Sequence, residues 1–143
     1  MSIRCCGRPW RAAIAAALVA GAVAWGCGIA QGPRDTLRET AFSFNEGLRW
    51  GRDADVLPRV DPAAMAGFQA MHAGWGAEIQ ISSAEILQTV LDEKSRKAVI
   101  TVKFTWYRND EMVVNETVMQ QHWELRKGGW WMVAEEYKSG TPL

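Results

Sequence analysis

The sequence of 143 residues lacks most of the features that identify enzymes and nucleic-acid binders. It has no net charge, with 16 basic and 16 acidic side chains, whereas nucleic-acid-binding domains carry a basic surplus. It has two histidines, and no His-Glu-x-x-His, Cys-x-x-Cys or glycine-rich phosphate loop occurs. We therefore expect no nucleic-acid partner, no metal site and no cofactor. A hydrophobic fraction of 48% nevertheless excludes a disordered chain.

Cysteine is scarce, and its positions indicate export. Cys5 and Cys6 lie in a segment with basic residues at its start and an unbroken run of apolar residues and glycine at 12–25. A basic start, a short apolar run and a small residue after it are typical of a secretory signal peptide. We predict that residues 1–26 are removed, which leaves Cys27 alone and excludes a disulfide in the mature chain. The alternative is an uncleaved membrane anchor, in which Cys27 is a passive small residue.

The residues Ala24-Trp25-Gly26-Cys27 resemble the end of a bacterial lipoprotein signal, which closes with a small residue and a cysteine. The resemblance implies that Cys27 becomes the first mature residue and carries acyl chains, so that membrane lipid is its partner. Two or more acyl chains make such an attachment stable. Gly28, in place of aspartate, implies for that family an outer-membrane protein facing the periplasm. Residues 27–33 form the lipidated tether in this interpretation.

Helical periodicity fills the first half of the mature chain. Pro33 suits a helix start, and apolar residues then recur at helical spacing at positions 37, 41, 44 and 48. We predict a helix over 33–50 and a short helical turn over 53–60. A second helix is expected over 62–73, with Asp61 as its N-cap and a proline at its first position.

From residue 79 onward the apolar period changes to two, which predicts strands. Four strands are expected, at about 78–91, 97–108, 112–127 and 130–138. The short turns between them favour an antiparallel meander. The first strand changes phase at Ser82-Ser83, which indicates a β-bulge. Helices followed by such a sheet make residues 34–143 one α+β domain, in which the helices pack on one face of a four-stranded sheet.

The segments KAVITVKFTWYR and TVMQQHWELRKGGWWMVAEEY resemble the back half of the NTF2-like (cystatin-like) α+β fold, in which helices and a curved sheet form a cone. Many members of that superfamily have a β-hairpin between their second and third helices, and residues 53–62 are too few for one. Some members, such as ketosteroid isomerases and SnoaL-type cyclases, hold an acid or a histidine in the cone cavity. By this resemblance, an enzyme would need a desolvated general base there.

Five polar residues are candidates for such a cavity, namely His72, Gln121, His122, Glu135 and Glu136. His72 shares an apolar helical stripe, which favours a core or boundary histidine over a catalytic one. His122 lies among charged residues on a polar strand face, which favours a solvated face with weak ion pairs. Gln121 lies on the apolar side of its strand, so its amide needs buried partners and is a candidate ligand-binding group.

Tryptophan is unusually frequent, with eight in the chain, and most are expected to fill the core. Trp130 and Trp131 are adjacent in a predicted strand, so they point to opposite faces. One of them must therefore meet solvent, a ligand or another chain. We predict that Trp131 lies inside and Trp130 outside, which makes Trp130, together with Gln121 and His72, a candidate ligand or partner contact.

These observations favour a membrane-anchored envelope lipoprotein with a small binding or scaffold domain and no demonstrable catalysis. Its partner would be a protein, or a second copy of the chain, across the open sheet face. One alternative is an NTF2-like enzyme of the isomerase or cyclase type, which requires a deep pocket with a cavity acid or base. The other follows from a resemblance to secretion-system assembly proteins, which use NTF2-like domains behind an uncleaved N-terminal anchor.

Overall fold

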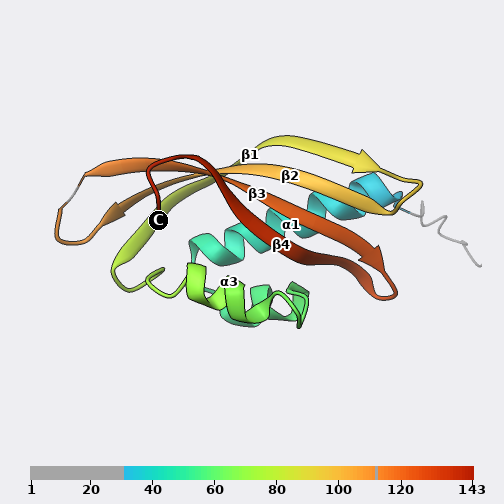
Figure 1. Cartoon of the computed structure of the whole chain (residues 1–143), viewed down its shortest axis with the longest axis horizontal. Helices are drawn as coiled ribbons and strands as arrows, with labels where there is room; N and C mark the ends of the chain where they lie inside the picture. Colours follow the sequence, from blue (N-terminus) through green and yellow to red (C-terminus); the bar gives the residue numbers. More distant parts are fainter. Residues whose placement is uncertain (1–30, 112) are drawn as a thin grey trace, which may run out of the picture.

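The computed structural model describes residues 31–111 and 113–143, in which helices come first and strands follow. The helical elements are α1 (Pro33–Arg49), α2 (Asp53–Val56), the 3-10 helix η1 (Leu57–Arg59) and α3 (Met65–Met71). The strands are β1 (Ile79–Asp92), β2 (Lys97–Arg108), β3 (Val114–Arg126) and β4 (Gly129–Gly140). They form one antiparallel sheet in the order β1-β2-β3-β4, which confirms the predicted α+β class and meander (Figure 1). The predicted leader and Cys27 lie outside the described residues.

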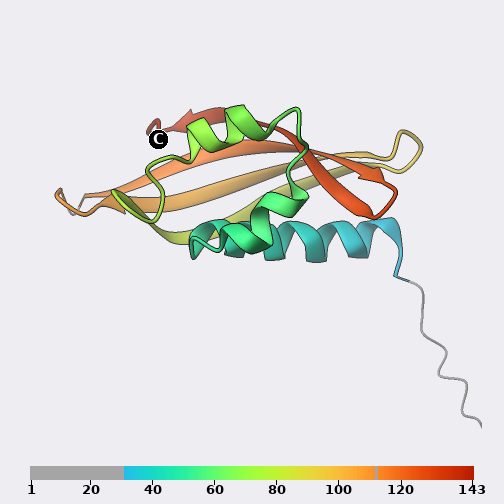
Figure 2. The ribbon, with the colours of Figure 1, turned by 90° about the horizontal axis from the view of Figure 1, so that it is seen from below.

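Helix α1 lies along one face of the sheet and closes the core from that side (Figure 2). Pro33 stands at its start, where the missing backbone N–H costs no helical hydrogen bond. Its buried stripe is Leu37, Ala41, Phe44, Asn45, Gly47 and Leu48. Gly47 allows α2 to pack closely, because an added Cβ would lie 2.7 Å from Cγ2 of Val56. The chain then turns at Gly51, which adopts a φ of 61° that favours glycine.

Helix α3 is shorter than the predicted helix over 62–73, and Asp61 is not its N-cap. The Asp61 carboxylate instead accepts a hydrogen bond from the backbone N–H of Ala63 at 2.7 Å and forms an ion pair with Arg126 on β3. These two contacts stabilise a turn over residues 62–64. The helix therefore starts at Met65, and its N-cap position is Ala64, which has no side-chain cap.

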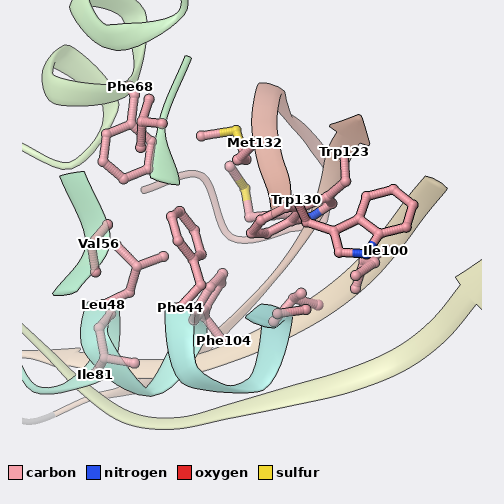
Figure 3. Close-up of a cluster of buried hydrophobic side chains, with 14 of the residues drawn as sticks. Phe44, Leu48, Val56, Phe68, Ile81, Ile100, Phe104, Trp123, Trp130 and Met132 are labelled. Atoms are coloured by element: carbon pink, nitrogen blue, oxygen red, sulfur yellow. The ribbon is translucent and has the colours of Figure 1, made fainter. Parts of the chain in front are cut away.

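The face of the sheet that carries the helices is apolar, as the alternation in β2 predicts. Its buried β2 residues are Ala98, Ile100, Val102, Phe104 and Trp106. Phe44 of α1 packs edge-on against Trp123 of β3, with ring centroids 5.1 Å apart, and Phe68 of α3 packs on Phe44 at 6.0 Å. Figure 3 shows these rings meeting between the helices and the sheet. The buried side chains of α1, α3 and the sheet thus form one continuous core.

Both edge strands contain β-bulges. The pairing of β1 with β2 skips Ser82, which confirms the predicted bulge, and skips Leu87 as well. The pairing of β4 with β3 skips Val133 and Lys138. The bulge at Val133 changes which side chains of β4 face the helices, because one extra residue inverts the alternation.

The prediction that Trp130 is outside and Trp131 inside is wrong. Trp130 is 1% exposed and lies in the core, whereas Trp131 is half-buried on the opposite face, paired with Glu124. The start of α1 explains the choice, because it covers the inner face at this point. The Trp130 Nε1–H donates to Pro33 O and Thr36 Oγ1, both at 3.2 Å. The helix thereby satisfies the polar atom of the ring that it buries.

The opposite face of the sheet is covered by no helix among the described residues (Figures 1 and 2). Charged side chains pair across its strands. Lys103 of β2 lies 3.3 Å from Glu85 of β1 and 3.4 Å from Glu116 of β3. Glu85 and then Glu116 raise the pKa of Lys103 above its ordinary value of 10.5. His122 and Glu136 also meet on this face, at 3.0 Å.

Candidate functional site

Four buried polar side chains form a continuous chain of contacts through the otherwise apolar interior. Asn45 comes from α1, Gln121 from the middle of β3, Glu135 from β4, and His72 from the residue that ends α3. They join elements that are far apart in the sequence. We refer to Asn45, Gln121, Glu135 and His72 as the polar chain.

Asn45 and Gln121 form a reciprocal amide pair. The Asn45 Nδ2 group donates to Gln121 Oε1 at 3.1 Å, and the Gln121 Nε2 group donates to Asn45 Oδ1 at 2.9 Å. The second hydrogen on Asn45 Nδ2 reaches the backbone oxygen of Ala41 at 2.8 Å, and the second hydrogen on Gln121 Nε2 reaches Glu135 Oε1 at 2.8 Å. All four amide hydrogens are therefore used, which is what full burial of two amides requires.

Glu135 reaches the interior because of the bulge in β4. If Val133 were paired as in a regular strand, the alternation that buries Trp130 and Met132 would bury Ala134 and expose Glu135. With the bulge, Ala134 pairs with His122 on the outer face, and Glu135 pairs with Gln121 on the inner face. The Glu135 side chain is 2% exposed as a result.

His72 and Glu135 contact each other in the interior. The distance from His72 Nε2 to Glu135 Oε2 is 3.1 Å, and neither buried atom has another polar partner among the described residues. His72 Nδ1 lies 2.8 Å from the backbone oxygen of Phe68, which only accepts hydrogen bonds, so Nδ1 carries a hydrogen. A neutral imidazole would then turn the Nε2 lone pair toward a carboxylate oxygen. A hydrogen bond between these two atoms therefore requires a hydrogen on one of them.

Two members of the polar chain, Asn45 and Glu135, lie beside grooves at opposite edges of the sheet. Asn45 lines a groove of about 940 Å³ between α1 and β1, with Phe42, Ala84 and Ile86 among its apolar residues. Glu135 lines a smaller groove of about 240 Å³ between α3 and β4. The hydrogen bonds from Asn45 through Gln121 to Glu135 therefore run from one groove to the other.

Aromatic rings enclose the His72 end of the polar chain. The His72 ring lies 4.1 Å from the Phe68 ring and 4.3 Å from the Trp75 ring, measured between centroids. Trp75 in turn packs on Phe104 of β2 at 5.0 Å. The buried Nε1–H of Trp75 has no acceptor within the described residues. This end of the polar chain therefore offers a buried imidazole–carboxylate contact and an unused donor in apolar surroundings.

The structure brings together three of the polar residues that the sequence analysis singles out, namely His72, Gln121 and Glu135. It separates them from His122 and Glu136, which pair on the outer face as expected for a solvated face. Asn45 was missed. Its signal was its position beside Phe44 on the buried side of α1, since a polar residue within an apolar helical stripe needs a buried partner.

Two further features bear on function. Among residues 31–111 and 113–143, no group of three or more His, Cys, Asp or Glu side chains could hold a metal ion. No helix in this same part of the chain has both the length and the hydropathy needed to cross a bilayer.

Comparisons with known proteins show that this chain is similar in fold to a solved structure. No family model and no curated protein sequence matches the chain. A solved structure that matches is the solution structure of a SEC-C motif containing protein from Rhodopseudomonas palustris, with a TM-score of 0.54 and 11% identity. The match covers 75% of this chain and 79% of that protein. At this identity the likeness establishes a shared α+β fold and nothing about activity.

Proposed function

We propose that the chain is an envelope lipoprotein, acylated at Cys27 and held in the outer membrane facing the periplasm, with an NTF2-like domain that binds a partner. The observation that carries the proposal is the sequence Ala24-Trp25-Gly26-Cys27 after a basic and apolar leader. It is supported by the position of Pro33, where α1 begins, six residues after Cys27. A tether of this length spans at most about 20 Å, so the domain would stay close to the bilayer.

The proposed binding surface is the groove between α1 and β1. Its volume of about 940 Å³ lies within the range of small-molecule sites, and its residues combine an apolar floor with polar groups. Phe42 lines it and is 63% exposed, an unusual exposure for a large aromatic side chain. A second copy of the chain, or another protein, across the open outer face of the sheet is the other surface that this proposal allows. No nucleic-acid or cofactor role is proposed.

The experiment that tests the anchoring is an intact mass measurement of the protein extracted from membranes. We expect a chain without residues 1–26, carrying acyl chains on Cys27. The matched variant Cys27→Ala should keep the leader or leave the membrane fraction. A full-length, unacylated wild-type chain in the membrane would contradict the proposal and favour a secretion-system assembly protein with an uncleaved anchor.

A second candidate function, an isomerase or cyclase of the NTF2-like type, is favoured by the His72–Glu135 pair. The pair combines a carboxylate and an imidazole 3.1 Å apart in an apolar region, which suits general acid–base chemistry. The free donor of Trp75, beside His72, could bind a carbonyl oxygen. Glu135 also lines the groove between α3 and β4, which gives a route for a ligand.

This second candidate is tested by hydrogen–deuterium exchange at the α-carbon of a cyclic ketone, followed by NMR. An enzyme of this type would accelerate the exchange, and Glu135→Gln, which keeps the shape of the side chain, would abolish the acceleration. The control is Glu136→Gln on the outer face, which should leave the rate unchanged. Absence of acceleration by the wild-type protein would contradict this candidate without affecting the lipoprotein proposal.

A further inference from the structure

Two turns of the sheet and the start of α1 lie together at the end of the molecule where the described chain begins (Figure 2). The indole N–H of Trp130, next to the β3–β4 turn, donates to Pro33 O at 3.2 Å. The backbone N–H of Leu125, near the same turn, donates to Arg96 O in the β1–β2 turn at 2.9 Å. We call this region the tether end and define it as residues 33–38, 59–61, 92–97 and 124–129.

Side-chain charge is divided unevenly between the tether end and the rest of the domain. The tether end holds eight basic and five acidic residues, a net charge of +3. The other residues from 31 onward hold five basic and eleven acidic residues, a net charge of −6. The balanced composition of the whole chain conceals this separation. The domain therefore carries a charge dipole whose positive end is the end at which the tether enters.

Most basic residues of the tether end are not used inside the fold. Six of them make no ion pair with any other described residue: Arg34, Arg38, Arg59, Lys94, Arg96 and Lys127. All of these except the half-buried Arg59 are exposed. Arg59 donates to Gly128 O at 3.4 Å, which holds its guanidinium beside the β3–β4 turn. The positive charge of this end is therefore available to a partner.

Three of the five acidic residues at the tether end are already engaged. Arg126, and then Lys97 at 3.3 Å, lower the pKa of Glu124 below its ordinary value of 4.5. Asp61 contacts Arg126, and Asp92 accepts the backbone N–H of Lys94 at 3.0 Å within its own turn. These carboxylates face local donors rather than a partner. They therefore compensate little of the charge on the six unpaired basic residues.

We propose that the tether end docks on an anionic bilayer, with its unpaired basic residues at the phosphate groups of the lipids. This inference rests on the proposed lipid anchoring, which would hold the end within about 20 Å of the headgroups. One basic residue near an anionic surface strengthens attachment about fivefold. The acidic remainder of the domain is repelled by the same surface, so charge and tether favour the same orientation.

The composition of the tether end fits a lipid surface better than a nucleic acid. Single-stranded nucleic acids are bound by exposed aromatic side chains interleaved with basic ones. The large exposed hydrophobic side chains of the described residues, Phe42 and Trp50 among them, all lie outside the tether end. The basic residues instead come from the start of α1, η1 and two hairpin turns, which together present charge without a stacking platform.

The experiment uses the full-length protein with Cys5→Ser and Cys6→Ser, reconstituted into vesicles. A donor dye is attached at Ser95→Cys in the tether end or at Asp110→Cys in the β2–β3 turn, and energy transfer to an acceptor on the lipid headgroups is measured. The vesicles contain phosphatidylethanolamine with phosphatidylglycerol, or phosphatidylcholine alone. The variant R34Q/K94Q/K127Q removes three charges from the tether end. The control R52Q/R108Q/K138Q removes three charges elsewhere, so the net charge of the two proteins is equal.

We expect transfer from position 95 to exceed transfer from position 110 on anionic vesicles, because docking fixes the orientation, and this difference should shrink on phosphatidylcholine. The difference should also fall with salt, because the Debye length shrinks from about 10 Å at 0.1 M to about 3 Å at 1 M. R34Q/K94Q/K127Q should weaken docking about a hundredfold, whereas the control should dock like the wild type. An equal difference on both vesicle types, or wild-type docking by R34Q/K94Q/K127Q, overturns the inference.

The lipidation proposal fails or holds on a separate measurement. Intact mass reports whether residues 1–26 are absent and Cys27 is acylated. Docking is scored from the dependence on lipid charge, and in a chain held by an uncleaved leader it is scored with Cys27→Ser added, so that the dye attaches only at position 95 or 110. A cleaved, acylated protein that shows no preference for anionic vesicles would contradict the docking inference alone.

Discussion

At the scale of single residues, the interior combines large aromatic rings with a few polar groups whose partners are specified. Gln121 is completely buried, and its amide is satisfied by Asn45 and Glu135. Trp130 is buried for a similar reason, because α1 supplies an acceptor to its N–H. A buried polar atom is tolerated where the fold provides its partner, and it is costly where the partner is removed.

The amide pair provides a direct test of this point. Asn45→Ala leaves the carbonyl oxygen of Gln121 without its donor in the core, so we expect a loss of about 1–3 kcal/mol in the free energy of unfolding. Gln121→Met should lose a similar amount. The double variant N45A/Q121M should lose less than the sum of the two, because the second change removes the unsatisfied group. Urea unfolding measures all three, and strictly additive losses would contradict the prediction.

The two adjacent tryptophans should differ strongly in their contribution to stability. Trp130→Ala removes a completely buried ring and should lower the free energy of unfolding by about 3–5 kcal/mol. Trp131→Ala removes a half-buried ring from the outer face and should cost about 1 kcal/mol. The same urea titration compares the two variants. Equal losses would show that the two side chains are not on the faces described here.

At the scale of elements, the sheet is regular in its centre and irregular at its edges. The pairing of β2 with β3 contains no bulge, whereas β1 and β4 each contain two. An edge strand exposes unpaired backbone N–H and C=O groups with which strands of other chains can pair, and bulges hinder this pairing. The bulge at Val133 has a second effect, because it turns Glu135 toward Gln121. One local irregularity thus protects an edge and completes the polar chain.

Deleting Val133 should leave the domain folded. The deletion removes only the unpaired residue, so the partners on either side of it keep their faces and Glu135 still points inward. Deleting Gln120 from the central strand β3 is the matched control. It shifts the register of the remaining strand by one residue and turns its apolar side chains outward, so we expect unfolding. Circular dichroism distinguishes the two, and an unfolded Val133 deletion would contradict the assignment of the bulge.

The contact between Asp61 and Arg126 connects the turn before α3 to β3, and it should make stability depend on pH. The backbone N–H of Ala63, and then Arg126, lower the pKa of Asp61 below its ordinary value of 3.8. Because the pKa of Asp61 is lower in the folded state, the ionised carboxylate stabilises the fold at pH values above the unfolded pKa of 3.8. This contribution is lost as the pH falls through the pKa of the folded state.

Asp61→Asn should therefore make the free energy of unfolding depend less on pH in the acidic range. The measurement is the free energy of unfolding from about pH 5 to about pH 2, where a carboxylate of this kind titrates. Arg126→Gln removes the second cause and should reduce this pH dependence in part, while the bond from Ala63 remains. A pH dependence in Asp61→Asn as steep as that of the wild type would contradict the prediction.

At the scale of the whole molecule, the helices and the sheet enclose one core that is built from residues 37 to 132. A domain of this size buries about two-thirds of the surface that its unfolded form exposes. Among the described residues the core begins in α1, so we expect residues 31–143 to fold by themselves. We expect a protein that starts at Gln31 to unfold in a single cooperative transition in urea. A gradual transition without a folded baseline would contradict this expectation.

Local patterns in the sequence determined the order of the elements, the α+β class and the meander, because helical and strand periodicities are properties of neighbouring residues. Ser82-Ser83 also revealed a bulge, since the phase change was visible within one strand. Only the tertiary structure decided that Trp130 is buried, because that depends on where α1 lies. It also decided that Glu135 faces Gln121 and that basic residues from separate turns gather at one end. Each of these depends on packing between distant segments, which periodicity along the chain does not encode.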